Sequence, residues 1–84
     1  MDAPLLHRKL EDIFRTVFDR ADLTIADGMT AADVEGWDSL AQINLIVGAE
    51  EAFAVRFQTA EIKSIKNIGE FKRLIADKTA AVRS

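Results

Sequence analysis

Residues 36–53 read GWDSLAQINLIVGAEEAF, and this stretch decides the fold. Asp38 is a good helix N-cap, because its carboxylate can accept a hydrogen bond from an unpaired N–H of the first turn. Apolar residues follow at helical spacing, at Leu40, Ile43, Ile46, Val47 and Phe53. The stretch therefore predicts a helix over 39–53 whose first residue is Ser39. Gly48 lies inside this helix, at a cost of about 1 kcal/mol relative to alanine. It either permits the close approach of a neighbouring helix or a partner, or is tolerated there without a role.

An amphipathic helix is predicted before it, over about 4–19. Its apolar face comprises Leu6, Leu10, Ile13, Phe14, Val17 and Phe18. Residues 20–37 are rich in turn-type residues and lack sustained periodicity, so we expect a long loop. Its scattered apolar residues are expected to pin the loop across the helices; they are Leu23, Ile25, Met29 and Val34.

The C-terminal side predicts a short helix and a longer one. We expect an extended link over 54–58, then a helix over about 60–66 capped by Thr59, with Ile62 and Ile65 pointing inward. Asn67 and Glu70 resemble a capping box for the last helix. That helix should bury Ile68, Phe71, Leu74 and Ile75. Residues 77–84 are expected to form a fraying tail, so we predict one all-α domain over 1–84 with its core at about 4–76.

The composition excludes several classes of function. A chain of 84 residues has no room for a deep cleft with a lid, so we expect no enzyme. It has no cysteine and only one histidine, His7, which excludes thiolate metal sites, histidine-rich metal sites and thiol nucleophiles. The net charge is −3 and residues 39–53 contain no lysine or arginine, which argues against a helix-turn-helix DNA-binding protein. No membrane-spanning run or signal-peptide pattern is evident, so we expect a cytoplasmic protein.

Chemistry is expected at Asp38 and Ser39. A hydroxyl in the first turn of a helix lies near unpaired N–H groups and the positive end of the helix dipole, which favours a phosphate ester there. The Asp38 carboxylate could serve a modifying enzyme through a divalent metal. The alternative is that Asp-Ser is ordinary helix-capping chemistry and that the chain is an unmodified helical interaction domain.

The residues from Gly36 to Leu40, with the apolar and acidic pattern that follows them, resemble an acyl carrier protein, and the resemblance runs from Leu6 to Ile75. It implies a four-helix bundle with three longer helices, one short helix and a long first loop. It also implies that Ser39 carries 4′-phosphopantetheine as a phosphodiester and that the thiol of this arm holds acyl groups as thioesters. The implied partners are a phosphopantetheinyl transferase and the enzymes that load and transfer acyl groups, and the implied state is a monomer.

Several residues depart from the fatty-acid-synthesis type of this family, which has an acid-rich second helix. Asn44 and Ala52 stand where acids are usual, and the short helix contains Lys63 and Lys66 where the fatty-acid-synthesis type is acidic. Electrostatic steering by this face should therefore be weaker. These departures favour a specialised pathway of polyketide, amino-acid or surface-polysaccharide type.

Partner contacts are expected on the helix that starts at Ser39 and just before it. Leu40 should lie exposed near the loop, while Val47 fits equally well as a partner contact or as core. Glu50 and Glu51 resemble docking acids, although they also suit a solvated helix end. Trp37 is expected to be partly buried beside Ser39 or to contact a partner.

Two positions leave other questions open. Ala49 replaces a larger aliphatic residue, which could widen an acyl cavity unless Phe71 fills the space. His7 is far from Ser39 in sequence, and no Gly-x-Ser-x-Gly motif is present, so a hydrolase is not expected.

Overall fold

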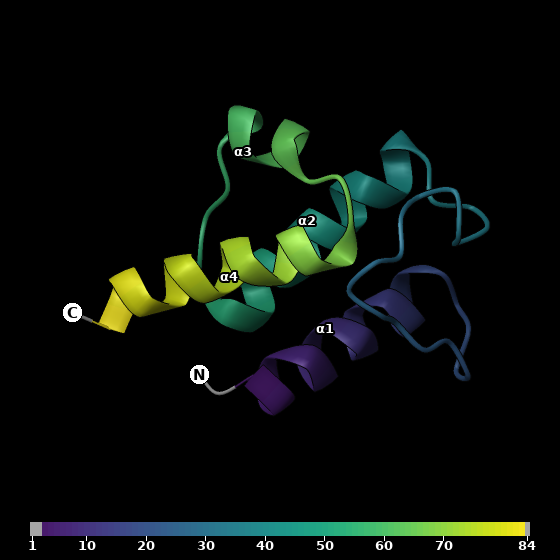
Figure 1. Ribbon diagram of the computed structural model, residues 1–84, viewed down its shortest axis with the longest axis horizontal. Helices are drawn as coiled ribbons and strands as arrows, with labels where there is room; N and C mark the ends of the chain where they lie inside the picture. Colours follow the sequence, from purple (N-terminus) through teal and green to yellow (C-terminus); the bar gives the residue numbers. More distant parts are fainter. Residues whose placement is uncertain (1–2, 84) are drawn as a thin grey trace.

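The computed structural model describes residues 3–83, with side chains described through residue 79. It contains four helices: α1 (Ala3–Val17), α2 (Ser39–Phe53), α3 (Thr59–Ser64) and α4 (Ile68–Arg83). A long loop separates α1 from α2, and the described residues form no strand (Figure 1). The predicted all-α class, with three longer helices and one short one, is confirmed. None of the described helices is long and apolar enough to cross a membrane.

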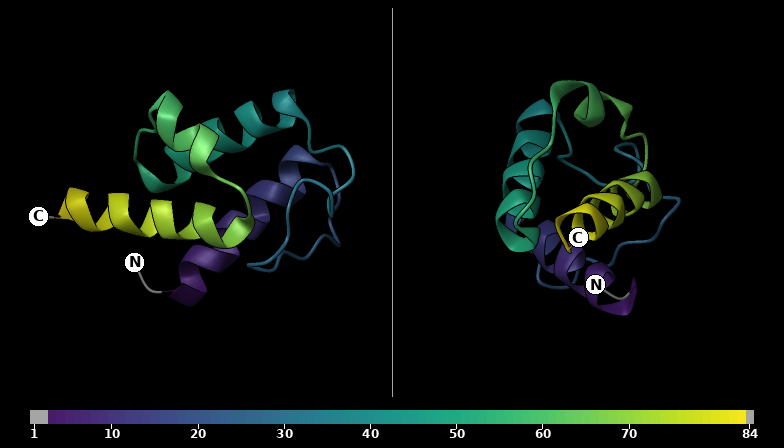
Figure 2. Two further views of the ribbon diagram at one scale, coloured as in Figure 1. Left: turned by 45° about the horizontal axis from the view of Figure 1, so that its top comes forward. Right: turned by 90° about the vertical axis from the view of Figure 1, so that its left-hand side faces the viewer.

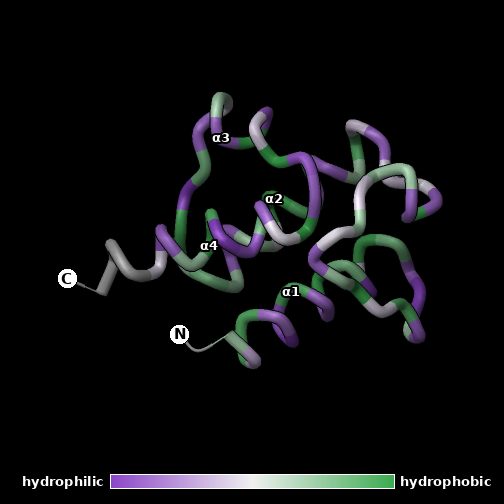
Figure 3. Tube along the Cα trace, in the orientation of Figure 1, coloured by the Kyte–Doolittle hydropathy of each residue, from purple (hydrophilic) through white to green (hydrophobic). Residues whose placement is uncertain are grey.

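Three helices build the core. α1, α2 and α4 pack against one another, while α3 lies on the side of the molecule away from α1 (Figure 1, Figure 2). Along α1, apolar residues alternate with polar ones, as expected for a helix with one face in the core (Figure 3). Among the side chains described, those with no exposed surface come from these three helices, and they are Leu10, Phe14, Leu45, Ala49, Ile68, Phe71 and Ile75. Full burial of each larger side chain contributes about 1.5–3 kcal/mol.

The contact between α1 and α2 depends on a glycine. A Cβ added at Gly48 would lie 2.9 Å from Cγ2 of Ile13, closer than side chains pack. Gly48 therefore permits the close approach of α1, which was one of the two predicted roles. α1 itself ends at Val17, two residues before the predicted boundary, and Asp19 has a left-handed φ of 53° that does not continue a helix.

The loop is fastened to α1 by two hydrogen bonds. Nε of Arg15 donates to the carbonyl oxygen of Leu23 over 2.7 Å, and the N–H of Ile25 donates to the Glu11 carboxylate over 3.1 Å. Leu23, Ile25 and Val34 are all buried. The predicted pinning of the loop by its apolar residues is confirmed, and these polar contacts add to it.

The same loop also fixes the start of α4. The N–H groups of Ile68 and Gly69 donate to the carbonyl oxygens of Met29 and Asp27, over 3.0 and 2.8 Å. These bonds satisfy donors that a helix start leaves unpaired. Nζ of Lys72 also lies 2.7 Å from the Asp27 carboxylate, and this hydrogen bond and charge hold the pKa of Asp27 below its ordinary value.

The link and α3 differ slightly from the prediction. Ala54 adopts a left-handed conformation that ends α2, and Val55 is buried behind it. Helix α3 starts at Thr59, so the predicted Thr59 cap is wrong: the cap is Gln58, whose N–H donates to the Glu61 side chain over 2.8 Å. The Glu61 side chain, at the third position of the helix, thus accepts the hydrogen bond of the backbone N–H at the cap residue.

One half of the predicted capping box of α4 is present, the half formed by Asn67. Asn67 Oδ1 accepts a hydrogen bond from the N–H of Glu70 over 2.8 Å, while the Glu70 carboxylate reaches the N–H of Lys66 rather than that of Asn67. Leu74, expected in the core, is only half-buried.

The sequence predicted a fraying tail from residue 77, and the structure describes this part of the chain as a continuation of α4 to Arg83. Tertiary contacts hold this last part of the helix. Nζ of Lys78 lies 2.8 Å from the Glu61 carboxylate on α3, and this contact lowers the pKa of Glu61. Thr79 is buried.

Candidate functional site

Asp38 and Ser39 form the start of α2 as predicted. Asp38 has an extended backbone, and its Oδ1 accepts a hydrogen bond from the N–H of Ala41 over 2.9 Å. Ser39 is the first helical residue and is exposed. Within the described part of the chain, its hydroxyl forms no hydrogen bond. The site thus presents a free hydroxyl at the positive end of a helix.

A tight turn leads the chain into this position. Gly36 has a φ of +88°, a conformation that residues with a side chain rarely adopt. The N–H of Trp37 donates to the carbonyl oxygen of Val34 over 3.2 Å, and that of Asp38 donates to the carbonyl oxygen of Gly36 over 3.0 Å. Gly36 therefore sets the direction from which the chain enters α2.

Trp37 anchors the same turn. Its ring meets Phe14 edge-on at 5.3 Å between centroids, and its Nε1–H donates to Oε1 of Gln42 over 2.7 Å. The predicted partial burial is confirmed, because Trp37 is half-buried against the core. Gln42 was not identified from the sequence as a partner of Trp37. The available signal was its position five residues after Trp37.

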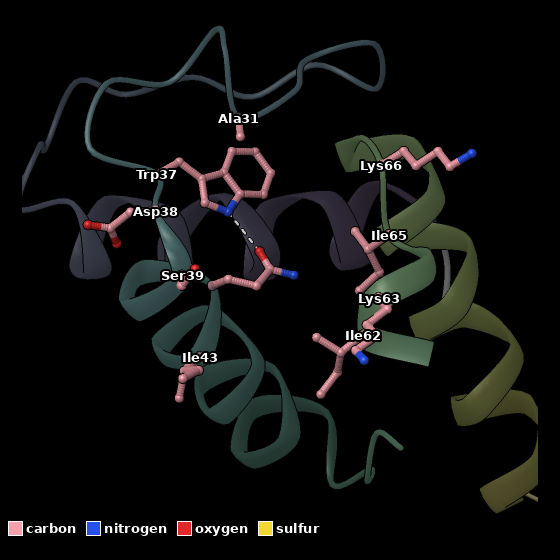
Figure 4. Close-up of a pocket in the computed structure, with 10 residues that line it drawn as sticks. Ala31, Trp37, Asp38, Ser39, Ile43, Ile62, Lys63, Ile65 and Lys66 are labelled. Carbon is pink, nitrogen blue, oxygen red and sulfur yellow. Dashed lines mark hydrogen bonds between the residues drawn. The ribbon is translucent and has the colours of Figure 1, made fainter. Parts of the chain in front are cut away.

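A hollow of about 550 Å³ opens beside Ser39, between α2 and α3 (Figure 4). Apolar side chains from both helices make up much of its wall. The residues that line it are Ala31, Trp37, Asp38, Ser39, Gln42, Ile43, Ile62, Lys63, Ile65 and Lys66. A group attached to the Ser39 hydroxyl would therefore have an apolar surface next to it.

The outer face of α2 carries an exposed apolar stripe, formed by Leu40, Ile43 and Val47. These side chains are 67%, 59% and 46% exposed, and their spacing places them on one face of the helix. The structure thus places Val47 at the surface, where the sequence left its position open. Ile43 was not identified as a surface residue, although its spacing from Leu40 and Val47 was the available signal.

The two acids near the end of α2 have different surroundings. Glu50 is half-buried and accepts a hydrogen bond from the N–H of Phe57 over 3.0 Å, so it holds the link after α2 in place. Glu51 is exposed. A docking role for either residue stays a prediction.

His7 lies apart from this site. Its Nδ1 is 3.1 Å from Nζ of Lys72, and its Nε2 is 3.7 Å from the Glu11 carboxylate. The structure therefore does not bring His7 to Ser39. Among the described residues, no cluster of three or more histidine and acidic side chains is arranged to hold a metal ion.

Comparison with known proteins gives two matches. Over 44 residues, 52% of this chain, the sequence is 39% identical to an acyl carrier protein of Acidothermus cellulolyticus, and the match spans about half of that relative's length (52%). The solution structure of holo acyl carrier protein from Geobacter metallireducens superposes with a TM-score of 0.84 at 34% identity, covering 90% of this chain and 87% of that one. No family model matches the chain.

Proposed function

The chain belongs to the acyl carrier protein family, and on that premise we propose that it carries acyl or aminoacyl groups as thioesters on a 4′-phosphopantetheine arm attached to Ser39. The Geobacter relative is a holo protein, which supports a covalent arm here as well. The arm supplies a terminal thiol, which a chain without cysteine lacks. The proposed role is therefore carriage between enzymes and not catalysis.

The observation that carries this proposal is the placement of the Ser39 hydroxyl. It is exposed, it forms no hydrogen bond in the described structure, and it opens onto the hollow between α2 and α3. A phosphodiester at this helix start would lie in a favourable field. These features fit the arm, since the attachment point is accessible and an apolar surface lies next to it.

A separate phosphopantetheinyl transferase would make the attachment. The Ser39 oxygen bonds to the phosphorus of coenzyme A that bears pantetheine, as the pyrophosphate bond to the adenosine half breaks. Adenosine 3′,5′-bisphosphate leaves, and the hydroxyl proton passes to a base of the transferase. Asp38 uses one carboxylate oxygen as the helix cap, so the other can ligate a divalent cation held by the transferase.

Partner enzymes that load and transfer the acyl group would dock near Ser39. Leu40 and Val47 are exposed on the same helix, Glu51 adds an exposed acid, and Glu50 and Trp37 are partly accessible. Tethering keeps the acyl group at a high effective concentration for successive partners. We propose that the carrier acts as a cytoplasmic monomer and that its interfaces are small and short-lived.

The proposed pathway is a specialised one, of polyketide, amino-acid or surface-polysaccharide type. The exposed Asn44 and Ala52 leave α2 with Glu50 and Glu51 as its only acids. Lys63 and Lys66 place positive charge nearby on and after α3. The surface formed by α2 and α3 should therefore attract a basic partner less strongly than the surface of a carrier with an acid-rich second helix.

The test is the intact mass of the protein after incubation with coenzyme A, magnesium and a promiscuous phosphopantetheinyl transferase. We expect the gain of one phosphopantetheine, which Ser39→Ala abolishes. Ser64→Ala is the matched control, because Ser64 is also an exposed serine in a helix. Modification of Ser39→Ala would refute the assigned site. No gain in the folded wild-type chain would favour the alternative, an unmodified interaction domain that uses the exposed stripe.

A further inference from the structure

The hollow beside Ser39 carries unpaired positive charge. Lys63 and Lys66 both line it, and neither ammonium group forms an ion pair with another described residue. The acid nearest Lys63 in sequence, Glu61, pairs with Lys78 at 2.8 Å. The acid nearest Lys66, Glu70, accepts a hydrogen bond from the backbone N–H of Lys66 over 2.9 Å and forms no ion pair with its ammonium group. Asp38 is the one acid that lines the hollow, and its carboxylate caps α2. The hollow therefore has two free cations against one acid that is already hydrogen-bonded.

Lys63 lies on the wall of the hollow opposite the attachment point. In Figure 4, Ile62, Lys63 and Ile65 face Ser39 and Ile43 across the hollow, while the Lys66 side chain extends away from α2. Lys63 is exposed and long, so its ammonium can move across the opening. The isoleucine side chains reduce the water around such a contact, which strengthens the attraction between opposite charges.

We propose that Lys63 binds an anionic group carried on Ser39, with Lys66 adding positive charge at the edge of the hollow, and that the hollow thereby retains anionic groups better than neutral ones. The inference rests on the proposed function, because it concerns a group attached to Ser39. The anion has two possible sources of the same chemistry: the phosphodiester of the arm itself, or a carboxylate at the far end of the acyl group. In the second case, the carrier retains a dicarboxylic acyl group in the hollow better than a neutral one of equal length.

The experiment compares three loaded forms of the full chain. The transferase is supplied with coenzyme A, butyryl-coenzyme A or succinyl-coenzyme A, and the intact mass confirms each product. Butyryl and succinyl groups have the same number of carbons, but only succinyl ends in a carboxylate. Backbone amide shifts of residues 62–66 are then measured in the wild-type chain, in Lys63→Met/Lys66→Met, and in Lys63→Met alone.

Arg8→Met is the matched control, because it removes one exposed positive charge on α1, away from the residues that line the hollow. We expect the loss of both lysines to reduce the bound fraction roughly two- to fivefold, the range of an accessible ion pair. Arg8→Met should leave it unchanged. Raising the salt concentration should weaken the contact in the wild-type chain.

The three forms identify the source of the anion. Lysine-dependent shifts that are larger with succinyl than with butyryl assign the site to a cargo carboxylate. Lysine-dependent shifts that are equal in all three forms assign it to the phosphodiester. Shifts that are the same in the wild-type chain and in the double variant overturn the proposal while leaving the carrier function intact. Failure of the mass gain itself would overturn both.

Discussion

Substitution of Asp38 tests two roles of one side chain. The carboxylate accepts a hydrogen bond from the N–H of Ala41 over 2.9 Å, and its charge lies at the positive end of α2. Loss of such a cap costs about 1 kcal/mol, and loss of the charge costs about 0.3–1 kcal/mol more. We therefore expect Asp38→Ala to lower the free energy of unfolding by about 1–2 kcal/mol. In a domain of this size, each kcal/mol corresponds to a fall in Tm of about 4–8 °C.

Asp38→Asn separates the cap from the charge. The asparagine amide oxygen can still accept the hydrogen bond, so only the favourable interaction of the charge with the helix end is lost. The free energy of unfolding should therefore fall by about 0.3–1 kcal/mol. A neutral amide is a poorer ligand for a divalent cation than a carboxylate, so the rate of arm attachment should fall strongly in the same variant. Stability and modification should therefore respond differently to this substitution.

The assay is urea unfolding followed by circular dichroism of the helices, with the attachment rate measured by intact mass. Ser39→Ala is the control for stability, because its exposed hydroxyl forms no hydrogen bond in the described structure and should contribute less than about 0.5 kcal/mol. Two results would refute the reasoning: an Asp38→Ala protein as stable as the wild-type chain, or an Asp38→Asn protein that is destabilised as much as Asp38→Ala.

Three further predictions concern the fold around the site. Gly36→Ala should lower the free energy of unfolding by about 1–2 kcal/mol, measured in urea, because of the positive φ of Gly36. Gly28 has no positive φ, and a Cβ added there would meet nothing within 4 Å, so Gly28→Ala should be neutral or slightly stabilising. The lowered pKa of Asp27 means that its pairing with Lys72 stabilises the fold above the ordinary value of 3.8 and is lost as the pH falls through the lowered pKa. Lys72→Met should therefore reduce the acid-side loss of stability, and an NMR titration of Asp27 should show its pKa returning towards 3.8; an unmoved pKa would contradict this. Phe14→Ala should cost about 3–5 kcal/mol, since Phe14 is fully buried, and a chevron or urea curve close to the wild type would contradict the assigned core.

Features decided by neighbouring residues could be predicted from the sequence. Helix capping involves side chains within three residues of the helix start, so Asp38 and Asn67 were identified correctly without knowledge of the fold. The cap of α3 was predicted one residue too late, at Thr59 instead of Gln58. The α1 face was also clear, because its apolar residues keep a helical period. The position of Ser39 in the first turn follows from its neighbour Asp38, whereas its role as the candidate attachment site came from the resemblance to acyl carrier proteins.

Features decided by distant contacts could not be predicted in this way. α2 is apolar on more than one side, so its period does not show whether Val47 or Ile46 faces the core; the packing of α1 and α4 decides it. The last turns of α4 have little apolar pattern, so the sequence did not predict that the helix continues there. The contact of Lys78 with Glu61 on α3 joins residues far apart in the sequence and could not be predicted from neighbouring residues. The hollow likewise requires α2 and α3 to meet, which only the tertiary fold specifies.

The two apolar faces of α2 separate stability from recognition. The buried face holds the helix in the core, so the exposed stripe of Leu40, Ile43 and Val47 contributes little burial to the fold. Apolar side chains at the surface are useful to a short-lived interface, where a few contacts supply most of the binding energy. Ile43 belongs both to this stripe and to the wall of the hollow. A partner enzyme that docks on the stripe would therefore touch one wall of the hollow, which links docking under the proposed function to access to the arm on Ser39.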